Sequence, residues 1–365
     1  MTQQINVLIV EDDNNVINSY QDILDSKSNT NYDIKLSSAN SVEEAKKILN
    51  NLNNVFDAAI VDIKLSNDDH QETNNGNVII KFLQDETRIP IFVVTGTPED
   101  VNDEFQNNQS SCLRIIPRDN DQDLFDEIIE LYKTGITRIL SRTGTIEQKL
   151  NRIFWDNLAY QLSNWINDDG STNPDKKEKS LLRYTLLHIM EHLELTTESN
   201  FENYHPAEIY ITPPIKNKHF TGDILKNRTD GKIFIILTPS CDMAQSKAKD
   251  ITLAEIEAHN EGLLNNFISN PNSDHKGKLK KLIENSHSYQ YHYLPNTHNV
   301  SGGLINFQKL SSENKDDLDN KFERIASVNS SFSKDIIARF SAYYARQGSP
   351  DLEAKKICEK LINVV

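Results

Sequence analysis

The chain has 365 residues, of which 37% are hydrophobic and 25% are charged, an ordinary composition for a soluble globular protein with two or three domains. It contains no run of about 18 apolar residues, so we expect no membrane-spanning helix. The N-terminus does not have the pattern of a secretory signal. Three widely spaced cysteines exclude a disulfide framework and favour a cytoplasmic location.

The net charge of −15 is concentrated in the first part of the chain. Residues 1–135 hold 25 of the 54 acidic residues and 10 of the 39 basic residues, which leaves 29 of each for the remainder. The acidic first part should repel nucleic acid, whereas the neutral remainder leaves nucleic-acid binding undecided.

Residues 1–135 alternate short, almost wholly apolar runs with helical patterns. This alternation predicts an α/β fold with a doubly wound, five-stranded parallel sheet that is covered on both faces. A capping box at Ser41 and Glu44 marks one helix start, and Pro98 lies just inside another. The predicted strands are 5–10, 33–37, 58–62, 91–95 and 113–116, and the predicted helices are 15–26, from 41, from 77, after 98, and 121–132.

Polar residues stand where four of these strands end. Glu11 and Asp12 follow the first strand, Asp62 ends the third, Thr95 ends the fourth and Arg118 follows the fifth. The carboxyl ends of parallel strands share one edge of a sheet, so we expect these side chains to converge. Three clustered carboxylates need a cation between them, and an all-oxygen ligand set favours Mg²⁺. A carboxylate beside Mg²⁺ can attack a phosphoryl group, whose oxygens the hydroxyl and the guanidinium could bind.

The runs VLIVEDD, IVDIKLS with the later Gly76, and PIFVVTGTPED resemble the receiver domain of two-component response regulators. The resemblance covers residues 1–135. It implies that Asp62 accepts a phosphoryl group from a partner histidine kinase, with self-phosphorylation and dephosphorylation chemistry at the same residue. Glu11 and Asp12 match the acidic pair that binds Mg²⁺.

By the same resemblance, Thr95 matches the switch hydroxyl of the family. The alternative for the acidic residues is that they cap the helices that follow the strands. Two positions depart from the family pattern: Arg118 replaces a lysine and keeps its charge but not the compact ammonium geometry, and Ile115 stands where the family has an aromatic switch residue. The loop after Asp62 is also longer and more acidic than usual.

Residues 136–200 are predicted to form a helical connector. Thr145 and Gln148 would make a capping box, and large apolar residues then follow at helical spacing for about three heptads. This stripe could pack on the output domain or form a homodimer through the 146–166 helix, because periodicity does not separate the two. Its members are Ile146, Leu150, Ile153, Phe154, Leu158, Leu162 and Trp165.

The run His188-Ile189-Met190-Glu191-His192 fits the H-x-x-E-H pattern of inverted zinc metalloproteases. The spacing places both histidines on one helix face, as a zinc site needs. The sequence identifies no third ligand, and two surface or partly buried histidines are the alternative.

Residues 201–365 are predicted to form an α+β output domain with a small sheet or barrel. The run GDIL at residues 222–225 and the apolar strand after it are similar to the start of the SH3-like barrels of MazF-type RNA-cleaving toxins. The predicted strands are 206–212, 222–225, 232–238, 289–294 and 304–307; residues 251–284 are predicted to be mainly helical, as are 333–347 and 351–364.

Chemically suggestive residues are scattered through this region. The run TPSCD resembles a motif of uncharacterised bacterial domains. In it Cys241 lies beside Asp242 at a strand end, near a helix start that would favour a thiolate, or is a buried small hydrophobe. Arg339, Arg346 and the cluster Lys276–Lys281 could meet phosphates or belong to a solvated charged face.

The sequence as a whole predicts a signalling protein of the response-regulator class, in which phosphorylation of Asp62 with Mg²⁺ controls an output domain of unknown activity. One alternative is a phosphorylation-controlled, nuclease-like effector enzyme. Another is a non-catalytic adaptor or phosphate sink with a degenerate receiver. Whether the output domain is an enzyme stays open at this point.

Overall fold

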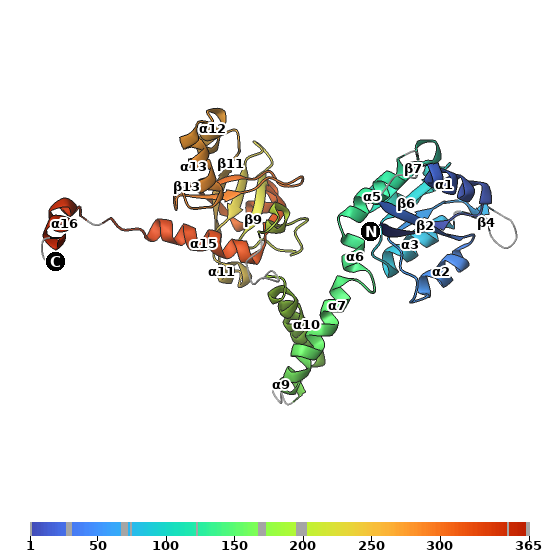
Figure 1. Ribbon diagram of the computed structural model, residues 1–365. Helices are drawn as coiled ribbons and strands as arrows, with labels where there is room; N and C mark the ends of the chain where they lie inside the picture. Colours follow the sequence, from blue (N-terminus) through green and yellow to red (C-terminus); the bar gives the residue numbers. More distant parts are fainter. Residues whose placement is uncertain are drawn as a thin grey trace. The chain divides into compact units, whose positions relative to one another are not determined.

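The computed structural model describes residues 2–26, 31–66, 72–73, 75–121, 123–166, 173–194, 203–348 and 350–362. The chain forms two compact units, Met1–Phe201 and Glu202–Val365. The first contains a parallel sheet and a helical hairpin, and the second contains an antiparallel sheet with its own helices (Figure 1). No helix among the described residues is long and apolar enough to cross a membrane.

The sheet of the first unit is wholly parallel and has the strand order β2-β1-β3-β6-β7. This is the flavodoxin-like order, and it confirms the predicted five-stranded, doubly wound fold. A separate two-stranded ribbon, β4 (Leu65–Ser66) with β5 (Glu72–Thr73), lies in the long loop after Asp62. The five strands are β1 (Gln3–Val10), β2 (Tyr32–Ala39), β3 (Ala58–Val61), β6 (Ile91–Thr95) and β7 (Leu113–Pro117).

Helices cover both faces of this sheet. One core cluster joins the sheet to α1 and α5, and the other joins it to α2, α3 and α4. At the start of α2 the Ser41 hydroxyl accepts the Glu44 N–H as predicted, but the Glu44 carboxylate accepts the N–H of Asn40 and not that of Ser41. The helices are α1 (Asn14–Ser26), α2 (Val42–Asn50), α3 (Gly76–Glu86), α4 (Asp103–Asn107) and α5 (Leu124–Lys133), with short 3₁₀ turns at Pro98–Asp100 and Arg118–Asn120.

After α5, one short helix leads into a helical hairpin. The ring centroids of Trp165 and Tyr184 are 5.9 Å apart and His192 Nε2 lies 3.4 Å from Asn157 Oδ1, so the two arms run antiparallel. The short helix is α6 (Ile136–Leu140). The first arm comprises α7 (Thr145–Ile153), a π-helical turn (Phe154–Leu158), α8 (Ala159–Gln161) and α9 (Ser163–Ile166), and the second arm is α10 (Pro174–Glu191).

The predicted capping box at the start of α7 is wrong. The N-cap is Gly144, Thr145 is already helical, and the Gln148 side chain donates to the Thr143 carbonyl. The reason is steric. A Cβ on Gly144 would lie 2.5 Å from the carbonyl oxygen of Arg138, so only glycine lets the chain turn this closely over α6.

The second unit is built on an antiparallel sheet with the order β12-β13-β11-β10-β9-β14-β8. Bulges in the β11–β13 and β9–β14 pairs bend it. The Tyr210 hydroxyl on edge strand β8 donates to Pro295 O, just after the opposite edge strand, over 2.7 Å. The sheet therefore curls into an incomplete barrel, as predicted. Its strands are β8 (Tyr210–Ile211), β9 (Asp223–Asn227), β10 (Ile233–Ile236), β11 (Asp250–Glu257), β12 (Tyr291–Leu294), β13 (Gly303–Asn314) and β14 (Phe322–Val328).

The prediction that residues 251–284 are mainly helical is wrong at its beginning. Residues 250–257 form β11, a central strand that pairs with β10 and β13 and buries Ile251, Leu253 and Ile256. Leucine, alanine and glutamate favour helices locally, but pairing on both sides overrides that preference. The helices are α11 (Ser240–Ala244), α12 (Gly262–Ser269), α13 (Ser273–Ile283), α14 (Leu318–Lys321), α15 (Ser330–Ala345) and α16 (Ala354–Ile362).

Candidate functional site

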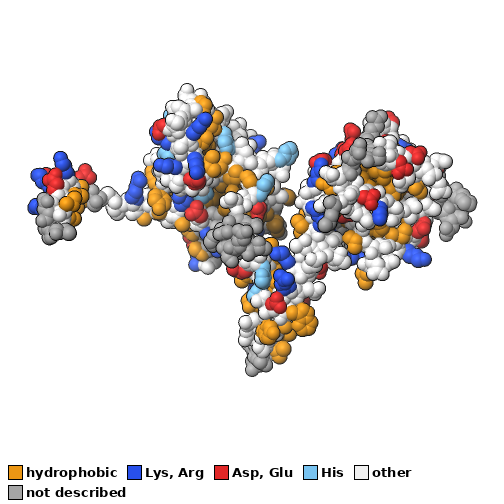
Figure 2. Space-filling model, viewed as in Figure 1, with side chains coloured by type: hydrophobic (Ala, Val, Ile, Leu, Met, Phe, Trp, Pro, Cys, Tyr) orange, Lys and Arg blue, Asp and Glu red, His pale blue; other side chains and the backbone are white. Residues whose placement is uncertain are grey.

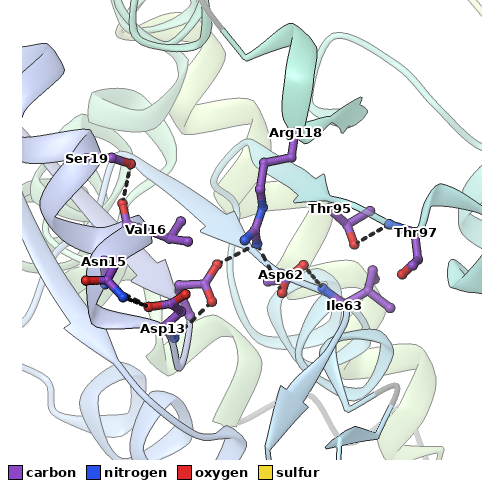
Figure 3. A network of polar contacts seen from close by, with 10 residues as sticks. Asp13, Asn15, Val16, Ser19, Asp62, Ile63, Thr95, Thr97 and Arg118 are labelled. Atoms are coloured by element: carbon purple, nitrogen blue, oxygen red, sulfur yellow. Dashed lines mark hydrogen bonds and ion pairs between the residues drawn. The ribbon is translucent and has the colours of Figure 1, made fainter.

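The predicted site residues of the first unit converge at the carboxyl edge of the parallel sheet. Glu11 and Asp12 follow β1, Asp62 follows β3, Thr95 is the last residue of β6 and Arg118 follows β7. One carboxylate oxygen from each of the three acidic residues lies within 4.8 Å of the other two. Figure 3 shows Asp62 between Arg118 and Thr95. The strand order explains this convergence, because β1, β3, β6 and β7 are consecutive neighbours.

Asp62 is held in a narrow place. Its side chain is nearly buried, and its Oδ1 accepts the N–H of Ile63 over 2.8 Å. Gly76, the first residue of α3, packs directly on the backbone here. Its N–H donates to Ile63 O over 3.0 Å, and a Cβ would lie 2.1 Å from the Asp62 carbonyl oxygen. A glycine is therefore required for α3 to begin against the residue that carries the central carboxylate.

Arg118 bridges two of the three carboxylates. Its Nη2 lies 2.7 Å from Glu11 Oε2 and 3.1 Å from Asp62 Oδ2. Its Nε is buried, and no acceptor among the described residues bonds to it. The guanidinium thus touches both acids through one nitrogen and does not form the two-pronged contact that arginine usually makes with a single carboxylate.

The electrostatics of the cluster are unfavourable for its charges. Burial, together with the nearby Asp62 and Asp12, raises the pKa of Glu11 to about 7, although the N–H of Asp13 and the charge of Arg118 oppose that shift. Burial also raises the pKa of Asp62, while Arg118 and the Thr95 hydroxyl act in the opposite direction. Burial therefore disfavours the charged form of both acids.

The donor set fits Mg²⁺. All three candidate ligands are carboxylates, which suit a hard cation that keeps several of its waters. The alternative role, capping of α1, is performed by another residue, because Asp13 Oδ1 accepts the N–H of Asn15 over 2.8 Å. The acidic pair before it is therefore not needed to start the helix.

Two further residues bear on how such a site would switch. Thr95 is buried, and its Oγ1 accepts the N–H of Thr97 over 3.2 Å. Ile115, at the place of the family's aromatic residue, is half-buried and packs against the core shared with α2 and α3. A switch in this chain would therefore have to work without an aromatic ring at that position.

Sequence reasoning missed a second carboxylate, at the opposite edge of the sheet. Asp57 directly precedes β3, accepts the N–H of Asn6 over 2.9 Å, and accepts the hydroxyl of Thr137 on α6 over 3.1 Å. Burial raises its pKa, and these two donors partly offset the shift. Its position just before an apolar run was the available signal, but its partner lies far along the chain.

Three arginines complete this junction between the sheet and the start of the hairpin. Arg88 Nη1 donates to Leu140 O over 3.1 Å, and Arg142 Nη1 donates to Leu49 O over 3.3 Å. Arg138 Nη1 donates to Gln3 Oε1 over 3.1 Å. A cavity of about 340 Å³ lies among the same segments. The connector is thus fastened to the amino edge of the sheet, away from Asp62.

The candidate residues of the second unit do not form a comparable site. Cys241 is exposed, so the expectation of a buried cysteine is wrong; its Sγ lies 3.7 Å from Asp242 Oδ1 in a helix of five residues. Arg339 donates to the carbonyls of Ser288 and Tyr291, which is a structural role. Arg346 stacks on the Tyr343 ring, and the lysines of α13 include Lys278 and Lys280, paired with Asp274 and Glu284.

The H-x-x-E-H run on α10 gains no third ligand. The ring of His188 packs against Tyr184, and His192 lies beside Asn157. Within the described parts of the chain, the group of potential metal ligands that comes together is Glu11, Asp12 and Asp62. The two histidines therefore belong to the packing of the hairpin.

Comparison with known proteins gives likeness in structure only. No family model matches the sequence. No curated protein matches it either. A CheY-like receiver domain from Methylobacillus flagellatus is 19% identical over 36% of this chain and 98% of its own, with a TM-score of 0.28. The N-terminal domain of a response regulator/sensory box/GGDEF protein from Carboxydothermus hydrogenoformans is 18% identical over 36% and 98%, also with a TM-score of 0.28.

A MazE–MazF structure from Deinococcus radiodurans is 10% identical over 36% of this chain and 99% of its own, with a TM-score of 0.23. Such low identities bear on fold and not on activity. The strand order of the parallel sheet gives residues 1–135 the flavodoxin-like fold that the sequence predicted. What the site does depends on the chemistry of this chain's own residues.

Proposed function

We propose that the chain is a response-regulator protein that is phosphorylated on Asp62 by a histidine kinase and thereby controls its C-terminal unit. The observation that carries the proposal is the meeting of Glu11, Asp12 and Asp62 at one sheet edge, with the cation of Arg118 across from them. Burying three carboxylates together costs free energy of desolvation, so packing alone does not explain the cluster.

The reaction follows from the groups present. An Asp62 oxygen attacks the phosphorus of a phosphohistidine, the new P–O bond forms as the P–N bond breaks, and the imidazole leaves. Glu11, Asp12 and Asp62 would hold Mg²⁺, which when bound neutralises charge on the transferred phosphoryl oxygens. The Thr95 hydroxyl would donate to one of these oxygens. Arg118, whose Nε has no acceptor, would turn from the carboxylates to another.

Control of the C-terminal unit would pass through the sheet to its opposite edge. β3 has Asp62 at one end and Asp57 at the other, and Asp57 holds α6 through Thr137. A shift of β3 on phosphorylation would therefore reach the first turn before the hairpin. Among the described residues no constellation singles out a reaction for the C-terminal unit, so the proposal extends to its control and not to its activity.

The test is phosphoryl transfer from acetyl phosphate in the presence of Mg²⁺, followed by intact-mass measurement. Wild-type protein should gain one phosphoryl group that is lost at alkaline pH, as an acyl phosphate is. Asp62→Asn should gain none. Asp57→Asn is the matched control, because it changes the other carboxylate that flanks the same strand, and it should still gain the group. Equal uptake by wild type and Asp62→Asn would refute the assignment.

A further inference from the structure

The first arm of the hairpin carries two apolar rows. The inner row faces the second arm: Ile153 is buried, and Asn157 and Trp165 contact His192 and Tyr184. The outer row lies one position further along the helix than the inner row. Its side chains are partly or largely exposed, and Ile166 reaches 68%. The π-helical turn within this arm helps to keep positions four residues apart aligned on one face. The outer row is Phe154, Leu158, Leu162 and Ile166.

The second arm repeats this arrangement. On α10 the inner row contains Leu181, Tyr184 and Thr185, which face the first arm. The outer row again follows one residue later and consists of exposed apolar side chains, with Leu182 at 57% and Leu186 at 52%. It continues through Met190 and Leu193, which are also exposed.

Both outer rows lie on the same side of the hairpin. One residue along an α-helix turns the side-chain direction by about 100°. The two arms run in opposite directions and face each other, so a one-residue advance on each turns both rows the same way. A groove of about 370 Å³ lies beside the outer row of the first arm: Phe154, Leu158 and Leu162 form one wall, and Leu181 and Thr185 of the inner row of α10 form the other. Figure 2 shows hydrophobic side chains gathered on the hairpin.

Two apolar rows about 100° apart on each helix are the pattern of a four-helix bundle. In such a bundle each helix packs on two neighbours that lie at roughly right angles to one another. An isolated hairpin satisfies only one of these contacts for each helix. The outer rows of this hairpin are the surfaces that the missing two helices would cover.

We propose that a second copy of this chain supplies the missing helices, so that two hairpins pair face to face into an antiparallel four-helix bundle. The pairing is isologous, because the same surface serves on both copies. The face is about 30 Å long and about 20 Å wide, judged from helix length and diameter. A stable dimer interface takes about 800 Å² from each partner, which is the same order.

Charge also suits a second copy. The first arm carries two acidic and two basic residues, and α10 carries three acidic and four basic residues. Each arm is therefore close to neutral, and an identical face meets it without strong net repulsion. This contrasts with the acidic receiver part of the same chain, which would repel a copy of itself.

The experiment is analytical ultracentrifugation of the full chain over a series of concentrations, without any phosphoryl donor. Wild type should be a dimer. Leu186→Glu and Leu162→Glu place a carboxylate in the centre of the outer rows and should weaken dimerisation at least about 100-fold. The matched control is Leu52→Glu, since Leu52 is 74% exposed on the receiver part, outside the hairpin. That variant should stay dimeric, and circular dichroism should show native helix content in all variants.

A mixture of ordinary and ¹⁵N-labelled chains, treated with a lysine cross-linker, identifies the occupant of the face. Peptides that join a labelled hairpin to an unlabelled one, through Lys149, Lys176 or Lys179, support the proposal. A wild-type monomer overturns it, and so does a dimer that survives both glutamate substitutions. Links from the hairpin only to residues 202–365 of the same chain would also overturn it, because the face would then be covered from within the chain.

Discussion

The two ends of the parallel sheet each hold an aspartate that flanks β3, and the two are treated in opposite ways. At the amino edge, Asp57 accepts a backbone N–H and a threonine hydroxyl, both from residues fixed in the fold. At the carboxyl edge, Asp62 shares Arg118 with Glu11 and stands within reach of two further carboxylates. Burial raises the pKa of both aspartates, so each carboxylate faces a desolvation cost.

The difference lies in the groups that surround each carboxylate. Asp57 accepts hydrogen bonds from the Asn6 N–H and the Thr137 hydroxyl, and it thereby joins the sheet to α6. Asp62 also has donors, because the Ile63 N–H and the Thr95 hydroxyl bond to it and Arg118 lies 3.1 Å away. It differs in lying beside two further carboxylates, one of which shares Arg118 with it, and a bound cation would neutralise this charge. The crowding of carboxylates around a buried aspartate thus separates the candidate reactive aspartate from the structural one, although both flank the same strand.

The largest expected effect concerns the pH dependence of the carboxyl edge. The pKa of Glu11 is raised to about 7 in the fold, above its ordinary value of 4.5, so between these pH values the native state holds a proton that the unfolded state lacks. The resulting stabilisation is fully present below pH 4.5 and is lost as pH rises through about 7. It amounts to about 3 kcal/mol in all.

Urea unfolding in EDTA at a series of pH values measures this change in the free energy of unfolding. Tryptophan fluorescence can follow it, because both tryptophans of the chain lie in the hairpin of the first unit. Glu11→Gln should remove most of this slope. Glu43→Gln, an exposed glutamate in the first turn of α2, serves as the control and should leave it unchanged. Equal slopes in wild type and Glu11→Gln would mean that the carboxyl edge is as well satisfied as the amino edge.

The second effect contrasts the two aspartates directly. Asp57→Ala should lower the free energy of unfolding by about 2 kcal/mol, because it leaves the Asn6 N–H and the Thr137 hydroxyl without their acceptor. Asp62→Ala should change stability little or increase it, since it removes a charge from a crowded acidic place. Urea midpoints at neutral pH without metal give both values. The comparison fails if the two variants are destabilised alike.

The third effect is stabilisation by metal. At ten times its dissociation constant, Mg²⁺ should raise the free energy of unfolding by about 1.4 kcal/mol, because it binds only the folded cluster. Asp12→Ala should abolish the increase. Asp33→Ala removes an exposed acid at the amino end of β2 and should preserve it. A metal effect that survives in Asp12→Ala would place the ion away from this edge.

The smallest effect in energy, but the most informative on coupling, concerns Thr137. Thr137→Val should cost about 1 kcal/mol by removing one hydrogen bond to Asp57. It should also diminish the change in hydrogen exchange that beryllofluoride, a phosphoryl mimic, produces within residues 146–166. Thr137→Ser keeps the hydroxyl and should keep the response. If all three proteins respond alike, the path between the edges does not run through this contact.

Much of the first unit could be predicted because its signals are local. β6 was predicted residue for residue, since the apolar run Ile91–Val94 is bounded by Pro90 and Gly96. The convergence of the candidate site residues could be predicted because parallel strands bring their carboxyl ends together whatever the loops do. Their chemical roles remain a prediction.

The remainder depended on distant partners. β11 contains helix-favouring residues and becomes a strand only because β10 and β13 pair with it. The position of Asp57 before an apolar run did not identify its partner, since Thr137 lies 80 residues away in the sequence. The capping pattern placed the N-cap of α7 on Thr145, but the N-cap is Gly144, which lies too close to Arg138 O for any side chain.

The amino-edge fastening sets a practical rule for dividing or recombining this chain. A fragment cut at residue 135 would lose Thr137, Arg138 and Arg142. The half-buried Asp57, the Gln3 side chain and the Leu49 carbonyl would then lose the donors that these residues supply. A fragment that continues through Gly144 keeps them all. Exchange of the parallel-sheet part for that of another protein should accordingly be made at Gly144, so that the donor residues of α6 stay with the sheet that they contact.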